Sequence, residues 1–449
     1  MSREVYDSNA DRNIKKFPHR ICYSLCAEVI NVTSFLISGG KTLEGQLVVQ
    51  GSKNAALPVI AAAVLHQGVT VIRGCPDILD VRYMLEILRS IGCQISWQED
   101  RLQIDAARIE MENLSRECVG KMRSSILFLG ALLGRCRHVV LDYPGGCTIG
   151  ARPVDIHLDA LKQMGVHIQE YDGAIHCKTD GLKGARIFLP YPSVGATENL
   201  MMAAVMADGI TWIHNAAREP EVRDLAGFLE AMGVTVYGAG TEKIGILGKM
   251  PLRDARYRVM PDRIVAGTYL LAAAGAGGEI ELMDEAVQDI GCLLHICEAM
   301  GCEVRRTAKG IYLKSCRRLL SVEDIHTRPF PGFPTDMQSQ MMAVLSTARG
   351  ESRIYEHIFE NRFRTADELK KMGADIKIKN NSAVITGVSG LRGCQVSAWD
   401  LRGGAALVIA GLMAEGDTIV ENSIFVERGY QDICKDLIQL GARIEISGK

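Results

Sequence analysis

Six segments of the chain share one arrangement of apolar and polar residues. In each segment an amphipathic helical stretch ends with an apolar residue and a glycine, and a strand-like stretch follows. The glycines are spaced 68 to 73 residues apart, at Gly92, Gly165, Gly233, Gly301, Gly373 and Gly441. Self-similarity at a fixed period is the signature of an internally repeated fold. The sequence therefore predicts six copies of one unit.

The pattern within a unit predicts the order of its elements. A helix that is apolar on nearly every side comes first, which is typical of a helix inside a core; examples span 54–65, 125–134, 199–206 and 405–413. Short strands are predicted next, at 69–73, 138–142, 210–214 and 418–421. A second helix follows with a one-sided apolar stripe, which in the first unit consists of Val81, Met84, Leu85 and Leu88. Two strands close the unit, often around a turn dipeptide such as Asp172-Gly173 or Lys309-Gly310.

The unit therefore has the order β-α-β-α-β-β, and the fold class is α/β. Six such units are too long for a single core, because domains of this kind seldom exceed a few hundred residues. We expect two domains of three units each, with the active site in the cleft between them, where ligand sites are common.

Composition and charge exclude several classes of protein. The formal charge is -2, which offers no basic footprint for nucleic acid or an acidic membrane surface. The longest apolar stretches, such as 55–65, fall short of the roughly 20 residues that cross a bilayer. Residues 1–34 carry scattered charges without a signal-peptide core, so we interpret them as an N-terminal extension that could be disordered. We expect a chain that acts on small molecules in the cytoplasm, without a nucleic-acid or membrane partner.

The fourteen cysteines do not predict disulfides or a metal site. They are dispersed and form no CxxC pair, which indicates free thiols in a reducing compartment. Cys292, Cys297 and Cys302 recur near His295, but a spacing of five residues scatters side chains around a helix. We predict no bound metal.

One cysteine stands in a different setting from the others. Cys147 follows two glycines in the segment YPGGCTIGARPVD, at residues 143–155. An adaptable, exposed loop lets a ligand reach the thiol and lets nearby cations shift its pKa. Most cysteines in such a chain are small buried hydrophobes, and this context makes Cys147 the exception.

A set of cations also suggests ligand binding: Lys53, Arg123, Arg152, Arg362, Arg402 and Arg428. Four of these six stand at or near the predicted start of an apolar helix or in the turn that leads to it. Helix starts expose unpaired N–H groups, so cations placed there help to hold phosphate or carboxylate. Any one of them alone is more simply a solvated surface charge. Their recurrence at equivalent points of different units favours an anion site.

Asp336 lies just after Pro329, Pro331 and Pro334, which stiffen the approach to the next helix. An aspartate in front of an apolar helix usually caps it. From the residues alone we interpret Asp336 as an N-cap, unless a family pattern gives it another role.

Taken together, these segments resemble the UDP-N-acetylglucosamine 1-carboxyvinyltransferase family of enolpyruvyl transferases. The resemblance runs from about Phe35 to the C-terminus and includes, in order, GSKNAALP (51–58), KMRSS (121–125), PGGCTIGARPVD (144–155), PSVGATEN (192–199), NAAREPE (215–221), PDR (261–263), FPTDMQ (333–338), FENRF (359–363), DLR (400–402) and RGY (428–430). It implies an inside-out α/β barrel in each of two domains, one at 53–260 and one at 35–52 plus 261–449. It also implies transfer of the enolpyruvyl group of phosphoenolpyruvate to the 3-hydroxyl of UDP-N-acetylglucosamine by addition and elimination. This is the first committed step of peptidoglycan synthesis and uses neither metal nor organic cofactor.

The resemblance also implies a role for each matched residue. Cys147 corresponds to the loop thiol that acts as general acid, forms a covalent phosphoenolpyruvate adduct and reacts with fosfomycin. Asp336 corresponds to the residue that receives the hydroxyl proton, and Lys53 and Arg428 are the further catalytic residues. The phosphoenolpyruvate ligands are Lys53, Asn54, Arg123, Arg152, Arg402 and Arg428. The sugar-nucleotide ligands are Asn54, Arg123, Arg152, Pro153, Val154, Asp155, Ile156, Ser193, Val194, Gly195, Asp336, Ile358 and Arg362.

Two departures and two rivals accompany this interpretation. The family normally begins near the equivalent of Phe35, and it usually has Asp where Glu427 precedes Arg428. The rival enzyme is the shikimate-pathway enolpyruvyl transferase, which lacks both the loop thiol and the PSVGATEN-like segment. The rival of another class is a silent paralogue that binds the sugar nucleotide to regulate a partner, in which loss of Cys147 or an arginine would be expected.

Overall fold

Two separate clusters of buried apolar residues form the interior of the protein. The computed structural model describes residues 33–111, 114, 116–145, 150, 154–283, 289–315 and 318–447. Within these, one cluster contains residues between 55 and 259, and the other contains residues 35–49 together with residues between 264 and 444. These clusters support the boundaries near residues 52 and 260, which we propose as the domain limits. The predicted extension at 1–34 lies outside the described residues up to residue 32.

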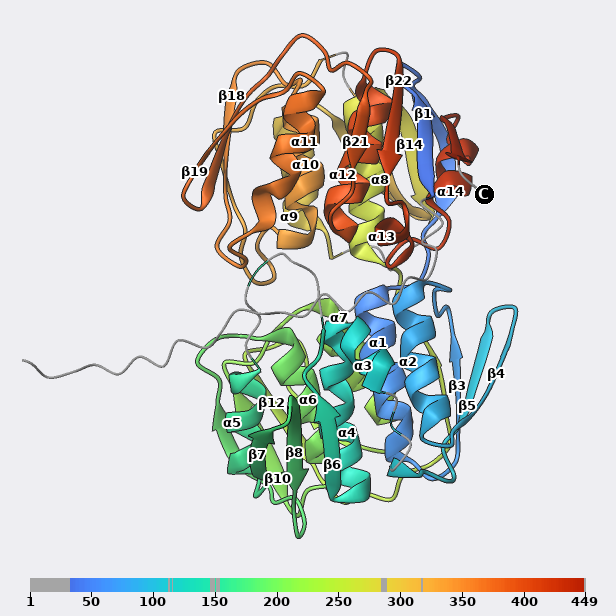
Figure 1. The fold of residues 1–449 in the computed structure, drawn as a ribbon, viewed down its shortest axis with the longest axis vertical. Coiled ribbons are helices and arrows are strands. Elements are labelled where there is room, and N and C mark those ends of the chain that lie inside the picture. The colour runs from blue at the N-terminus through green and yellow to red at the C-terminus, as the bar shows by residue number, and fades with distance from the viewer. Residues whose placement is uncertain are drawn as a thin grey trace, which may run out of the picture. The chain divides into compact units, whose positions relative to one another are not determined.

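Each cluster is built on three helices that are buried on nearly every side, flanked by sheets (Figure 1). In the first cluster these are α1 (Lys53–Ala62), α4 (Leu127–Cys136) and α6 (Val194–Val205). In the second they are α8 (Arg263–Ala276), α10 (Gln338–Leu345) and α12 (Leu401–Met413). Small residues allow this close packing: the Gly130 N–H of α4 donates to Oδ1 of Asn199 on α6 at 2.5 Å. The all-round apolar pattern of the first predicted helix is confirmed.

A second set of helices packs against the cores and keeps some residues exposed to solvent. These are α2 (Leu79–Ser90), α5 (Asp155–Gln163), α7 (Pro220–Ala231), α9 (Gly291–Ala299), α11 (Thr365–Lys371) and α14 (Ile433–Gln439). In α2 the predicted stripe is at most 1 % exposed. Shorter helical segments are η1 (Ala63–Leu65), α3 (Arg116–Lys121), η3 (Arg123–Ile126), η4 (Thr335–Met337), η5 (Arg362–Arg364) and α13 (Ile424–Glu427).

Three sheets of the described residues accompany the first cluster. One has the order β13 (Ala255–Arg258), β3 (Val69–Arg73), β5 (Arg101–Asp105), β4 (Gln94–Gln98). The second has the order β6 (His138–Asp142), β8 (Ala174–Lys178), β7 (His167–Tyr171). The third has the order β11 (Thr235–Tyr237), β12 (Lys243–Leu247), β10 (Ile210–His214), β9 (Arg186–Phe188). The turn between β7 and β8 has positive φ at Asp172 and Gly173, as the sequence predicted.

Three further sheets accompany the second cluster. The first has the order β15 (Glu303–Thr307), β16 (Gly310–Lys314), β14 (Gly278–Met283), β2 (Leu43–Val48). The second has the order β17 (Asp324–His326), β18 (Glu351–Tyr355), β20 (Ser382–Thr386), β19 (Asp375–Lys379). The third has the order β21 (Gln395–Ser397), β22 (Asp417–Glu421), β1 (Ser34–Ser38), β23 (Arg443–Ser447). β1 pairs antiparallel with both β22 and β23. The first strand of the described residues therefore completes the last unit of the chain.

The sheets agree with the predicted α/β units but leave the exact count of six a prediction. Five of the sheets have four strands, whereas β6-β8-β7 has three among the described residues. The last unit borrows β1 instead of closing with its own hairpin. No helix of the described residues has both the length and the apolar character that a membrane span needs.

Candidate active site

Asp80 holds two of the predicted cations together. Lys53 opens α1, directly after the N-cap Ser52, whose side chain accepts the Ala55 N–H. The Nζ atom of Lys53 lies 2.6 Å from Oδ2 of Asp80, and Nε of Arg428 donates to Oδ1 of Asp80 at 2.8 Å. The Asp80 side chain is 3 % exposed, so the carboxylate that joins the two cations is shielded from water. Sequence reasoning missed Asp80, although a carboxylate on the buried stripe of α2 was a usable signal.

Burial and charge act in opposite directions on these groups. Burial disfavours the carboxylate of Asp80, but Lys53 and Arg428 outweigh burial and lower its pKa. Burial lowers the pKa of Lys53, the carboxylate of Asp80 opposes that effect, and the positive charges of Arg402 and Arg428 add to it. Lys53, Arg402 and Arg428 are therefore close enough to repel one another, and a carboxylate is what keeps them together.

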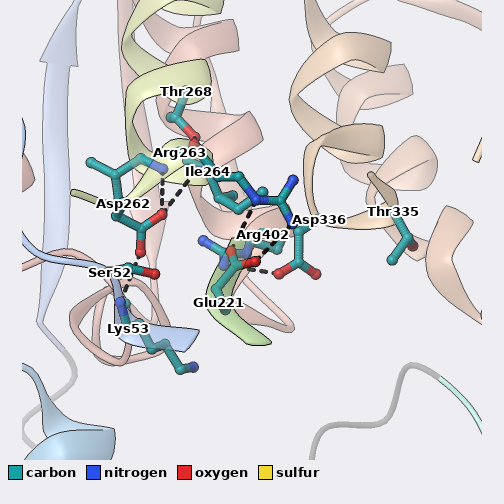
Figure 2. Close-up of polar contacts among 12 residues, drawn as sticks. Ser52, Lys53, Glu221, Asp262, Arg263, Ile264, Thr268, Thr335, Asp336 and Arg402 are labelled. Carbon is teal, nitrogen blue, oxygen red and sulfur yellow. Dashed lines mark hydrogen bonds and ion pairs between the residues drawn. The ribbon is translucent and has the colours of Figure 1, made fainter. Parts of the chain in front are cut away.

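Asp336 forms a second ion-paired group. Its Oδ1 accepts from Nη2 of Arg362 at 2.9 Å. Its Oδ2 accepts from Nη2 of Arg402, also at 2.9 Å (Figure 2). Both guanidinium groups are at most 4 % exposed. Interpreting Arg362 and Arg402 as solvated surface charges is therefore wrong. The Nε of Arg362 and the Nη1 of Arg402 are buried and find no hydrogen-bond partner among the described residues.

The interpretation of Asp336 as a helix cap is also wrong. Pro334 caps η4 and Met337 caps α10, while Asp336 lies inside η4. Its carboxylate points to the two guanidinium groups because two charge-assisted hydrogen bonds stabilise it more than one backbone N–H would. Burial opposes ionisation of Asp336, but Arg402 and Arg362 outweigh it and hold the pKa well below the usual range.

Asp262 joins the starts of two core helices. It caps α8, where Oδ1 accepts the N–H groups of Ile264 and Val265. Its Oδ2 accepts the backbone N–H of Lys53 at 2.9 Å, so one carboxylate fixes the first residue of α1 beside the start of α8 (Figure 2). The segments 50–53 and 260–262 therefore lie next to each other where the chain passes between the two clusters.

A pocket of about 460 Å³ gathers many of the predicted ligand residues. Asn54, Arg123, Ile156, Ser193, Val194, Gly195, Asp336 and Ile358 all line it. Ser193 caps α6 and accepts the Ala196 N–H, which directs the first turn of this twelve-residue helix to the pocket wall. A helix start of this kind favours an anion such as a diphosphate.

Other predicted residues lie elsewhere or outside the described residues. Val154 is buried and Asp155 is exposed at the start of α5, and neither lines the pocket. Asp155 instead accepts the N–H of Ile156 at 2.9 Å. Cys147, Arg152 and Pro153 are not among the described residues. Their predicted roles therefore stay predictions.

The pocket also contains acidic residues that sequence reasoning did not assign. Glu198, Glu219 and Glu221 line it together with Arg263. Nε of Arg263 donates to Oε1 of Glu221 at 2.9 Å, and both side chains are buried (Figure 2). Burial, reinforced by the charges of Glu221 and Glu219, raises the pKa of Glu198 well above its usual value. The glutamates within the segments PSVGATEN and NAAREPE were the sequence signal that could have identified these acidic residues.

His157 lines the same pocket. Its Nδ1 lies 3.0 Å from Nδ2 of Asn199, which also donates to the Ile126 carbonyl. Burial, with a contribution from the positive charge of Arg123, lowers the pKa of His157 to about 4. The imidazole is therefore neutral at physiological pH, which suits a pocket that already holds a cation.

The comparisons with known proteins agree with this geometry. The family model described as EPSP synthase (3-phosphoshikimate 1-carboxyvinyltransferase) matches residues 37–437. UDP-N-acetylglucosamine 1-carboxyvinyltransferase 2 of Caldanaerobacter subterraneus subsp. tengcongensis is 47 % identical over 410 residues, which cover 91 % of this chain and 98 % of the relative. The chain belongs to the UDP-N-acetylglucosamine 1-carboxyvinyltransferases of the EPSP synthase family.

Further relatives extend the match. UDP-N-acetylglucosamine 1-carboxyvinyltransferase 1 of Symbiobacterium thermophilum is 45 % identical over 91 % of this chain and 94 % of its own length. The crystal structure of the enolpyruvyl transferase NikO from Streptomyces tendae superposes with a TM-score of 0.84 at 24 % identity, over 93 % of this chain and 99 % of that chain. EPSP synthase from Acinetobacter baumannii gives a TM-score of 0.70 at 20 % identity, over 93 % and 100 %. The predicted two-domain α/β fold of the enolpyruvyl transferases is confirmed.

Proposed function

We propose that the chain transfers the enolpyruvyl group of phosphoenolpyruvate to the 3-hydroxyl of UDP-N-acetylglucosamine and releases phosphate. The observation that carries this proposal is the cluster of Lys53, Arg402 and Arg428, held by the carboxylates of Asp80 and Asp336 in a chain 47 % identical to a protein of that name. In the reaction the sugar oxygen adds to C2 of phosphoenolpyruvate while its methylene carbon gains a proton. The resulting ketal then loses that methyl proton and phosphate together.

The cation cluster suits a substrate with both a phosphate and a carboxylate. Nη1 of Arg402 is a buried donor without a partner in the described chain, and the positive ends of Lys53 and Arg428 share one carboxylate. An incoming anion would satisfy these donors and offset the repulsion among the three cations. Fixed cations stabilise charge that develops on a leaving phosphate without reorganisation, which is how such sites accelerate a reaction.

Asp336 is a weak base while two guanidinium groups hold it. Its lowered pKa means that it accepts a proton from a neutral hydroxyl only if that charge is first diverted. We propose that the substrate anion engages Arg402, so that the carboxylate recovers basicity when both substrates are present. Asp336 also lines the pocket with Asn54, which puts an acceptor where the sugar hydroxyl would bind.

Cys147 is the proposed proton donor toward the methylene carbon. It follows two glycines, and in the sequence it comes eight residues before α5, whose residues Ile156 and His157 line the pocket. A thiol next to arginines has a lowered pKa and is a competent acid, base or nucleophile near neutral pH.

We propose that the start of α6 receives the diphosphate and that Arg123 neutralises it. Ser193, Val194 and Gly195 line the pocket at that helix start. The dispersed cysteines, which form no CxxC pair, and the net charge of -2 support small-molecule chemistry in the cytoplasm, without a nucleic-acid partner.

Phosphate release measured with each substrate alone and with both together tests the proposal. We expect release only with phosphoenolpyruvate and UDP-N-acetylglucosamine together. Release with shikimate 3-phosphate in place of the sugar nucleotide would assign the chain to the other branch of the family. Binding of the sugar nucleotide without any turnover would instead indicate the silent paralogue.

Labelling with fosfomycin tests the thiol. Cys147→Ser is expected to lose most turnover and all labelling, whereas Cys292→Ser, a half-buried cysteine of α9, should keep both. Unchanged labelling of Cys147→Ser would identify a different reactive thiol.

A further inference from the structure

Four arginines share the outer face of the sheet β13-β3-β5-β4. The strand register aligns Arg258 with Arg73 and Arg73 with Arg101, so three of them stand side by side on adjacent strands. Arg256 lies two residues before Arg258 on β13, on the same face. All four are exposed, while Ala255, Ile72 and Leu102 of the same strands are buried on the opposite face. In Figure 1, β3, β5 and β4 lie side by side along one edge of the group that contains α1 and α2.

The four side chains line one depression of about 420 Å³, together with Val71 and Tyr257. Val71 is on the outer face of β3, yet it is 9 % exposed. We attribute this cover to the long arginine side chains, whose methylene groups pack over apolar residues while the charged ends reach water. The guanidinium groups therefore rim a concave surface instead of spreading over a flat one.

Few carboxylates balance these charges. Asp100 accepts from Nη1 of Arg258 at 3.0 Å and from the backbone N–H of Gly74 at 2.6 Å. Arg101 bonds to the neutral side chain of Gln103 at 3.0 Å. In the part of the chain that the structure describes, the Arg73 and Arg256 side chains have no carboxylate partner. Like charges on directly opposed strand positions destabilise a sheet, so this arrangement has a cost unless an anion offsets it.

We propose that this sheet face binds the phosphate groups of a small oligophosphate, at a site separate from the substrate pocket. Neighbouring strands lie about 4.8 Å apart, so three aligned arginines cover a row long enough for more than one phosphate group. Arginine binds phosphate through two parallel N–H groups, which favours phosphate over chloride. None of the four arginines lines the pocket that holds Asn54 and Asp336. The ligand is a nucleoside triphosphate or an inorganic chain of the same charge.

Calorimetric titration of the full chain with inorganic tripolyphosphate tests the proposal. Excess phosphoenolpyruvate is included so that the cations near Lys53 are occupied. We expect saturable 1:1 binding that weakens with added salt. In the variant R73Q/R256Q the affinity should fall at least about tenfold, because two charge-assisted contacts are lost.

The control removes the same charge from other sheets. R186Q/K377Q changes exposed residues of β9 and β19 and should bind tripolyphosphate like the parent chain. Equal affinity in the two double variants, or no saturable binding to the parent chain, would overturn the proposal. A parallel titration with ATP distinguishes the sources, since tighter binding than tripolyphosphate indicates a nucleotide and equal binding indicates recognition of the phosphates alone. R73Q/R256Q should keep phosphate release from the two proposed substrates, which separates this site from the proposed function.

Discussion

The guanidinium Nε of Arg428 lies 2.8 Å from Oδ1 of Asp80, across 348 residues of sequence. Asp80 is at the start of α2, whose stripe belongs to the first apolar cluster, whereas Tyr430, two residues after Arg428, belongs to the second. This contact ties the two clusters together at the cation group. Because Asp80 also binds Lys53, one carboxylate sets the position of two cations that come from different ends of the chain.

Replacing Asp80 by Asn should lower the efficiency of the enzyme and shift its pH profile. The carboxylate of Asp80 raises the pKa of Lys53 against burial, so its removal should lower that pKa further. Lys53 then loses its charge at a lower pH, and the alkaline limb of kcat/KM for phosphoenolpyruvate should move toward neutrality. We expect a loss of about tenfold or more, because breaking a buried ion pair leaves charge uncompensated.

Asp77→Asn is the matched control for Asp80→Asn. Asp77 bonds to Arg82 on the surface, where both side chains are well exposed, so its loss should change little. An alkaline limb in Asp80→Asn at the same pH as in the parent enzyme would show that Asp80 does not control the charge of Lys53.

Replacing one of the two arginines that contact Asp336 should bring the titration of the Asp336 carboxylate into the measurable pH range. Arg362 and Arg402 lower the pKa of Asp336, so Arg362→Gln should raise it. The acid limb of kcat would then appear at higher pH, since the carboxylate is needed in its ionised form. Arg364→Gln is the control on the same turn, because its guanidinium stacks on Trp399 at 3.8 Å and does not contact Asp336. An unmoved acid limb in Arg362→Gln would exclude Asp336 as the titrating group.

Local patterns predicted the elements of this fold but not its long-range pairings. The apolar positions of α1, α2 and β3 follow from periods that each segment carries by itself. The insertion of β1 between β22 and β23 has no local signal, because any half-apolar strand could fill that position.

The candidate site likewise contains some residues that the sequence could predict and others that it could not. Lys53 and Arg402 could be predicted because both stand in the first turn of an apolar helix. The partner of each could not, since Asp80 and Asp336 are brought to them by tertiary packing. The misinterpretation of Asp336 as a cap has the same origin: capping is a local preference, and two arginines from later units overrode it.

The free energy of unfolding should depend on pH through one buried carboxylate, that of Asp224. Burial raises the pKa of Asp224 to about 6, although the Tyr257 hydroxyl donates to it at 2.9 Å. The folded state then binds this proton more readily than the unfolded chain, so the contribution of Asp224 is present at low pH and is lost as pH rises through about 6. The variant Asp224→Asn has no carboxyl group at this position, so it should not lose this stability as the pH rises. Its melting temperature should exceed that of the parent by more at pH 8 than at pH 5.

Glu230→Gln is the control for the change in net charge, because Glu230 is an exposed residue of the same helix. Its melting temperature should follow the parent at both pH values. A constant difference between Asp224→Asn and the parent from pH 5 to pH 8 would contradict the raised pKa.

The contact between α4 and α6 should tolerate little added volume. A Cβ on Gly130 would lie 2.1 Å from the Asn199 carbonyl oxygen and 2.4 Å from Asn199 Oδ1, so Gly130→Ala must separate the helices. Overpacking of this kind costs about 2–3 kcal/mol. Gly120→Ala is the control, since a Cβ there meets nothing within 4 Å, and it should match or slightly exceed the parent in thermal stability.

The separation of α4 and α6 in Gly130→Ala should also affect the pocket, because Asn199 contacts His157, and Ser193, Val194 and Gly195 stand at the start of α6. The KM for UDP-N-acetylglucosamine should therefore rise more than the KM for phosphoenolpyruvate. The proposed phosphoenolpyruvate ligands Lys53, Arg402 and Arg428 are held by Asp80 and Asp336, which are not part of the α4–α6 contact. Equal changes in the two KM values would mean that the α4–α6 contact supports the fold without shaping the sugar-nucleotide wall.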